Sequence, residues 1–246
     1  MRQHGVRVLS RCDRELLRFV AEQYLVTLPQ LAQLADRCPR TARWLRTRWQ
    51  RAGLIDGAKL LVDEPSVIWL SRPGLAALGL PWKTVRPSYG NIPMLAVMVE
   101  LRLAAQDQYP RTRWLSRRVL SHAYPVPSPL PDALLTNEHG SVAILAKPDA
   151  LPRRQLERKV LPLLGKYHHL LVVLPEAGRR TRDWFDELGG NASVLAYRRD
   201  PRRATLPRLP ALEALEPPAA SEQDWPMPRS VDPCGDFPTS PHTDRV

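Results

Sequence analysis

Prolines divide this chain, and their placement limits what it can fold into. Nine of them fall between Pro207 and Pro241, and a second group interrupts the sequence between Pro81 and Pro93. Such breaks stop helical and strand periodicity, and the last stretch also has too few aromatic residues to offset the entropy lost on ordering. We therefore predict an N-terminal domain over 1–80, a linker over 81–93, a central domain over 94–206 and a disordered tail over 207–246.

Charge is unevenly distributed along the chain. The whole protein carries +11, but the predicted tail holds seven acidic residues against three arginines, a net charge of −4, which leaves +15 for residues 1–206. A basic body predicts a polyanionic partner, with nucleic acid favoured over a membrane surface. All but five of the 36 basic residues are arginine, so genomic base composition is an alternative source of the bias.

The cysteines and apolar runs indicate the compartment. Cys12, Cys38 and Cys234 are far apart and form no CxxC pair, which excludes a disulfide framework and a zinc finger and fits a reducing cytoplasm. No apolar run approaches the roughly 20 residues that a bilayer span needs, and no signal-peptide pattern opens the chain. We expect a cytoplasmic protein that does not bind membranes.

The N-terminal domain reads as three helices followed by a hairpin. Asp13 is expected to cap a first helix whose apolar positions extend to Tyr24, and Thr27 to cap a second. A third helix should begin at Pro39, and strand segments at 54–55 and 59–62 should form the hairpin with a second strand at 67–70. A helix-turn-helix followed by a β-hairpin is the winged-helix arrangement, which predicts DNA binding.

The third helix carries the strongest functional signal. Ala42, Leu45 and Trp49 form one apolar stripe, while the other side has several arginines and no acidic residue. A merely solvated face would mix in glutamates for i,i+4 pairing, whereas a cationic face suits a major groove, where arginine can fork onto guanine or phosphate. The predicted DNA contacts on this helix are Arg40, Thr41, Arg43, Trp44, Thr47, Arg48 and Arg51, with Lys59 of the hairpin approaching phosphate.

The central domain alternates helices and strands. Helices are expected over about 92–105, 151–164 and 180–188, and strands at 112–116, 132–136, 141–147, 168–174 and 193–197. This order predicts an α/β domain with a mixed sheet, and an α+β organisation for the chain as a whole.

Asp132 and Lys147 form a catalytic pattern that is incomplete. In restriction-endonuclease-like folds, PD…(D/E)xK places two carboxylates and a lysine on neighbouring strands, where the carboxylates bind magnesium. Here Leu145 stands in the position of the second acid, and the available substitutes, Glu100 and Glu157, are each expected to be surface charges. We predict a nuclease-like domain without catalytic activity and without a cofactor; magnesium would be needed only if nuclease activity survives.

With these motifs the chain resembles the plasmid replication-relaxation family over about residues 10–200. The resemblance is carried by the run DRELLRFV at 13–20, the basic helix leading into AGLI at 52–55, and PDALL at 131–135. Proteins of that family come from actinobacterial and firmicute plasmids and other mobile elements, and join a winged helix to a nuclease-like α/β domain. The family usually has an acid where Leu145 stands.

Several functions stay open on this reading. The first is a sequence-specific or structure-specific double-stranded DNA-binding protein acting in replication, or its control, on a plasmid or other mobile element. The alternatives are a winged-helix transcriptional regulator, a magnesium-dependent DNA nuclease using Asp132 and Lys147, and a protein-interaction module. Expected partners are double-stranded DNA, other replication or transfer proteins at the central domain or tail, and a second copy of the chain in a homodimer. Two roles are open for the acidic tail: competition with DNA for the arginines of the third helix, or a solubilising or partner-docking linker.

Overall fold

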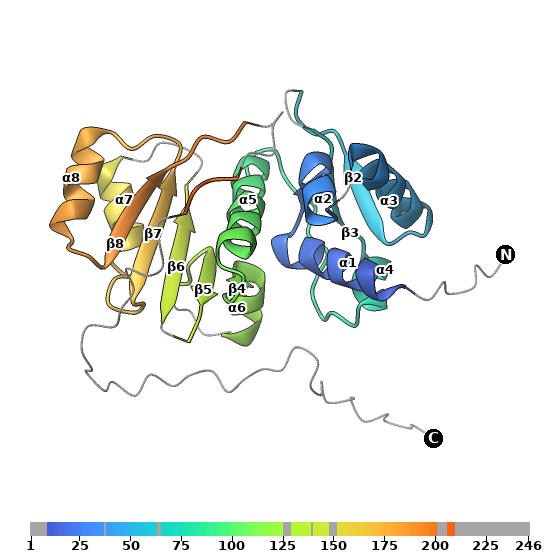
Figure 1. Cartoon of the computed structure of the whole chain (residues 1–246), viewed down its shortest axis with the longest axis horizontal. Helices are drawn as coiled ribbons and strands as arrows, with labels where there is room; N and C mark the ends of the chain where they lie inside the picture. The colour runs from blue at the N-terminus through green and yellow to red at the C-terminus, as the bar shows by residue number, and fades with distance from the viewer. Residues whose placement is uncertain are drawn as a thin grey trace, which may run out of the picture. The chain divides into compact units, whose positions relative to one another are not determined.

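The computed structural model describes residues 9–36, 38–62, 65–124, 129–138, 140–147, 152–200 and 206–209. Within these ranges the chain forms a mixed α/β structure with eight helices and two β-sheets (Figure 1). None of the helices in the described ranges is long and apolar enough to cross a membrane.

The N-terminal part combines four helices with a three-stranded antiparallel sheet in the order β1-β3-β2. Leu17, Val20 and Trp49 lie at the centre of its core and are almost completely buried. The helices are α1 (Arg11–Gln23), α2 (Leu28–Leu34), α3 (Pro39–Arg51) and α4 (Arg72–Ala77), and the strands are β1 (Val26–Thr27), β2 (Ile55–Ala58) and β3 (Val67–Leu70).

Side-chain caps determine where the first two helices begin. Thr27 caps α2 as predicted, and it forms a capping box with Gln30, in which each side chain accepts a hydrogen bond from the other residue's backbone N–H. The prediction for α1 was wrong, because Ser10 is the cap and its Oγ accepts from the Asp13 backbone N–H at 3.1 Å. Tyr24 is not within α1 either, since it ends the helix with a φ of 67°.

The hairpin is shorter than the sequence predicted. Strand β2 ends at Ala58, whose register partner is Val67 on β3. Residues 59–62, predicted as strand, lie beyond β2, and Leu60 and Leu61 pack against an apolar cluster that includes Trp69 instead. Both leucines are partly buried there. Residues 63 and 64 of the predicted turn lie outside the described residues.

The central part contains a five-stranded mixed sheet in the order β4-β5-β6-β7-β8, which confirms the predicted class. Strands β4, β5 and β6 pair antiparallel, whereas β6, β7 and β8 pair parallel. Its helices are α5 (Ile92–Gln108), α6 (Arg117–Ala123), α7 (Arg153–Val160) and α8 (Arg179–Glu187), and its strands are β4 (Arg113–Ser116), β5 (Ala133–Thr136), β6 (Ser141–Ala146), β7 (His169–Leu174) and β8 (Ala192–Ala196).

Successive residues of β6 pack into layers on opposite faces of this sheet. Ile144 packs with residues of α5, while Leu145 packs with residues of α7 and α8. Figure 1 shows α5 on one side of the sheet and α7 and α8 on the other. The sheet is therefore covered on both faces, as its parallel half requires.

Helix α5 belongs to both cores. Val99 and Leu103 pack into the N-terminal core, whereas Met98 and Leu101 pack against the central sheet. The predicted boundary between linker and central domain at residues 93 and 94 therefore falls inside α5, which begins at Ile92. The described residues belong to one compact unit.

Candidate nucleic-acid interface

Three buried side chains fix the orientation of α3. Ala42, Leu45 and Trp49 are all buried, as the apolar stripe predicted, and the Trp49 Nε1 donates a hydrogen bond to Asp13 at 2.9 Å. Gly53, with a φ of +70°, follows the end of the helix in a left-handed conformation that favours glycine. The opposite side of α3 consequently faces solvent.

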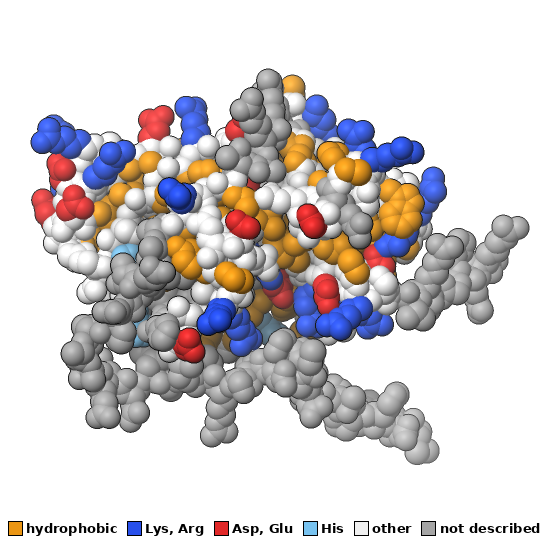
Figure 2. All heavy atoms as spheres, in the orientation of Figure 1, with side chains coloured by type: hydrophobic (Ala, Val, Ile, Leu, Met, Phe, Trp, Pro, Cys, Tyr) orange, Lys and Arg blue, Asp and Glu red, His pale blue; other side chains and the backbone are white. Residues whose placement is uncertain are grey.

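That opposite side is exposed and cationic. Arg40, Arg43, Thr47 and Arg51 are exposed, and Trp44 keeps 56% of its accessible surface; we call these five residues the cationic face of α3. Figure 2 shows lysine and arginine side chains gathered along the outer edge of the region that α3 occupies. No acidic residue lies within α3 to neutralise them.

Arg48, predicted as a DNA contact alongside these residues, is engaged within the protein. Its guanidinium forms an ion pair with Asp13 of α1 and lies over the Trp44 ring, with Cζ 4.6 Å from the ring centroid. Ser10 Oγ also donates to the Asp13 carboxylate, at 2.7 Å. Burial raises the pKa of Asp13, but hydrogen bonds from Ser10 and Trp49 and the charge of Arg48 outweigh burial and hold it below its ordinary value. Arg48 therefore links α3 to α1.

The remaining predicted DNA contacts differ in whether their side chains have partners within the protein. Thr47 donates its hydroxyl to the Arg43 carbonyl at 2.9 Å, and Thr41 is half-buried with its hydroxyl 3.5 Å from Cys38 Sγ. Lys59 is exposed directly after β2. Both threonines thus have local partners, while Lys59 is a solvent-exposed cation that follows β2.

Sequence reasoning missed Arg46. It is half-buried, and two nitrogens of its guanidinium lie 3.6 Å from the position that a Cβ on Gly57 of β2 would take, which is ordinary contact distance. Arg46 follows Arg43 by three residues, so an i,i+3 search along the helix could have found it. It adds a cation at the junction between α3 and the hairpin.

A second group of predicted residues meets where β5 begins and β6 ends. Lys147 Nζ lies 3.3 Å from Asp132 Oδ2, and the Ala146 backbone N–H donates to the same oxygen at 3.0 Å. Arg117 Nη1 lies 3.0 Å from the other oxygen, Oδ1. Asp132 is buried, and its carboxylate is satisfied by two cations and a backbone amide.

This arrangement does not fit a magnesium ion. Magnesium requires several oxygen ligands, but both oxygens of Asp132 already accept hydrogen bonds, and Leu145 is 4% exposed within an apolar layer. Glu157 pairs with Arg153 on its own helix at 2.7 Å. The described ranges hold no group of three or more histidine, cysteine or acidic residues that could bind a metal.

The expectation that Glu100 is a surface charge was wrong. It is 1% exposed, and its carboxylate accepts hydrogen bonds from Gln30 Nε2 at 3.0 Å, Tyr197 Oη at 2.7 Å and Arg199 Nε at 2.8 Å. Burial raises the pKa of Glu100, against the opposing effect of these three partners. Because this carboxylate joins α2, α5 and the segment after β8, it serves packing rather than a metal site with Asp132.

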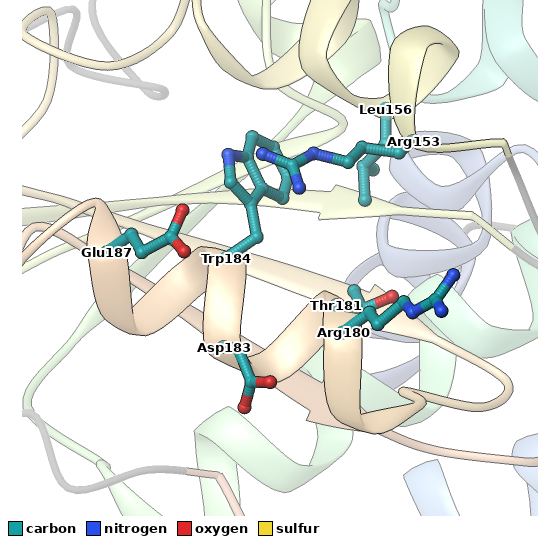
Figure 3. A pocket seen from close by; sticks show the side chains of 7 residues that line it. All are labelled: Arg153, Leu156, Arg180, Thr181, Asp183, Trp184 and Glu187. Carbon is teal, nitrogen blue, oxygen red and sulfur yellow. The ribbon is translucent and has the colours of Figure 1, made fainter.

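A further hollow, of about 390 Å³, lies between α7 and α8 (Figure 3). Trp184 projects from α8 toward Arg153 of α7, whose Cζ lies 5.6 Å from the indole centroid, and Arg180 lines the hollow further along α8. Asp183 and Glu187 balance the two arginines, and Trp184 is 5% exposed. The hollow therefore offers neither a net charge nor a free aromatic surface.

Comparisons with known protein families, with curated proteins and with solved structures find no match to this chain. Among the described residues, the cationic face of α3 is the feature with the clearest chemical purpose.

Proposed function

We propose that the protein binds double-stranded DNA through α3 and acts in replication, or its control, on a plasmid or other mobile element. The observation that carries the proposal is the division of α3 between a buried apolar stripe and an exposed cationic face. A helix held by one side and cationic on the other can lie in a major groove, with guanidinium groups reaching phosphates and base edges.

The order of elements supports a winged-helix assignment for this part of the chain. Helices α2 and α3 pack against each other, and the hairpin β2–β3 follows α3 directly. In that arrangement Lys59 and Arg46 would approach the DNA backbone beside the groove occupied by α3. A regulator of transcription would use the same surface, so the replication role rests on the resemblance to the replication-relaxation family.

The α/β domain is proposed to be restriction-endonuclease-like in fold but not a nuclease. Asp132 and Lys147 occupy neighbouring strand ends, as the PD…(D/E)xK pattern requires. Leu145 supplies no second carboxylate, and Arg117 occupies the Asp132 oxygen that a metal would need. The domain would then serve as a rigid support for the DNA-binding part.

A salt titration with matched arginine variants tests the DNA-binding proposal. Arg40→Ala/Arg43→Ala should weaken binding of the full chain to duplex DNA at about 50 mM salt. It should also reduce the slope of log K against log[salt] by about 1.8, because each phosphate contact contributes about 0.9. The control Arg154→Ala/Arg158→Ala removes two exposed arginines from α7, and should retain the wild-type slope. Equal losses in both variants would mean that α3 is not the interface.

A further inference from the structure

An aromatic ring stands at the centre of the cationic face of α3. Trp44 lies four residues after Arg40 and three before Thr47, so these side chains share one side of the helix. More than half of the indole is exposed. Apolar surface of this size is unfavourable in water, and electrostatic attraction to phosphate gives no reason for it.

Contacts that lead into the core hold this ring in place. The Arg48 guanidinium lies over the indole, and its other contact is the buried Asp13 carboxylate. Asp13 is itself fixed by Ser10 and by Trp49 Nε1. Because Arg48 is anchored, the Trp44 ring loses little further freedom when a partner covers it, which favours a specific contact over a loose one.

A major groove offers one kind of apolar group to such a ring. The base edges there are hydrogen-bond donors and acceptors, except for the C5-methyl group of thymine. We infer that Trp44 contacts thymine methyl groups, and that Arg48 and Asp13 are positioning residues that orient its ring. The inference rests on the proposed binding of DNA through α3, and adds a base preference to it.

Two duplexes that differ by thymine methyl groups test this inference without knowledge of the natural target. The full chain is titrated with an alternating dA–dT duplex and with the same duplex carrying deoxyuridine for thymidine. Burial of one methyl group is worth about fourfold in affinity, so the wild-type protein should bind the thymine duplex about fourfold more tightly or better. Trp44→Ala should bind both duplexes equally. The control Tyr89→Ala removes another exposed aromatic side chain, outside α3, and should keep the preference.

The outcomes separate this inference from the proposed function. Equal binding of both duplexes by the wild-type protein, or a preference that survives Trp44→Ala, would overturn the thymine contact and leave DNA binding standing. Failure to bind either duplex would refute the proposed function, and the inference with it.

The positioning role has its own readout. Arg48→Lys keeps the positive charge beside Asp13 but removes the planar group over Trp44. A smaller thymine preference with an unchanged salt slope supports that role, and an unchanged preference overturns it.

Discussion

Among single residues, Asp13 connects α1 to α3 most directly. Its carboxylate accepts from Ser10, Arg48 and Trp49, and each of these bonds holds either the start of α1 or the buried side of α3. The apolar stripe of α3 could be predicted because helical periodicity is local. The engagement of Arg48 could not, since its partner lies 35 residues earlier in the chain.

Replacement of Asp13 tests this connection through stability. Asp13→Ala should lower the free energy of unfolding by about 3 kcal/mol, because it leaves a partly buried guanidinium and an indole N–H without their acceptor. Asp13→Asn keeps an acceptor oxygen and should cost less. Urea unfolding followed by tryptophan fluorescence measures both variants, and an Asp13→Ala protein within about 0.5 kcal/mol of wild type would contradict the assignment.

The same contacts predict how the stability of the wild-type protein, relative to Asp13→Asn, depends on pH. The pKa of Asp13 in the folded protein lies below its ordinary value of 3.8, so the unfolded chain binds more protons as the pH falls past that value. The stabilisation is therefore complete at neutral pH and is lost as the pH falls through the folded-state pKa. The advantage of wild type over Asp13→Asn should narrow below about pH 4, because asparagine does not titrate.

At the level of elements, α5 was predicted as a helix, but its packing into two cores was not. Its helical character was predictable from the apolar residues between Ile92 and Ala105, but these residues surround the helix rather than form a stripe. A helix that is apolar on all sides is buried on all sides, and α5 accordingly packs into two cores. The position of Pro93 suggested a linker, although proline is also well tolerated in the first turn of a helix.

Helix α6 was missed for a different reason. Ser116 is the last residue of β4 and also the N-cap of α6, where its Oγ accepts from the Val119 backbone N–H. No turn residues separate the strand from the helix, so Ser116 is the one boundary signal there and it lies within the strand. The strands β5 to β8, by contrast, are short apolar runs bounded by polar or glycine residues, and their predicted ranges agree with the structure to within one or two residues.

The hydrogen bonds that Glu100 of α5 accepts from other elements give a stability prediction. Glu100→Ala should destabilise the protein by about 2 to 3 kcal/mol, since Gln30, Tyr197 and Arg199 each lose a buried acceptor. The control Glu157→Ala removes an i,i+4 pair at the surface of α7 and should cost about 0.5 kcal/mol or less. Chemical denaturation compares the two, and equal effects would show that the Glu100 contacts add no net stability.

In the molecule as a whole, contacts of α5 and α6 connect the N-terminal and central parts, which the sequence predicted to be separate domains. Arg102 of α5 pairs with Glu22 at 2.6 Å, and Arg118 of α6 donates to the Ala21 carbonyl at 2.7 Å while lying against the rings of Tyr24 and Trp82. Composition marks breaks in periodicity, but it carries no information about such distant contacts. A fragment ending at residue 80 would lack them, so DNA binding is better tested in the full chain.

The start of the predicted tail is also part of this unit. Gln108 at the end of α5 donates to the Pro207 carbonyl at 2.8 Å and accepts from the Leu209 N–H at 2.9 Å. Leu209 is buried in the core beside the central sheet. The predicted boundary at residue 207 therefore divides a segment that packs against α5, and the rest of the predicted tail, 210–246, lies outside the described residues.

Truncation at two nearby positions separates the packed segment from the acidic sequence that follows it. A chain ending at Leu206 loses the buried Leu209 and should melt about 5 °C lower, since roughly 2 kcal/mol of burial is removed. A chain ending at Leu209 should melt like the full protein.

The chain ending at Leu209 also lacks seven acidic residues and two arginines, which together carry a net charge of −5. If those acids compete with DNA for the arginines of α3, this truncated chain should bind random duplex DNA more tightly than the full chain at about 50 mM salt. The gain should shrink as salt screens the competing charges. Equal binding by the Leu209 truncation and the full chain at that salt concentration would show that the acidic sequence does not act on the DNA site.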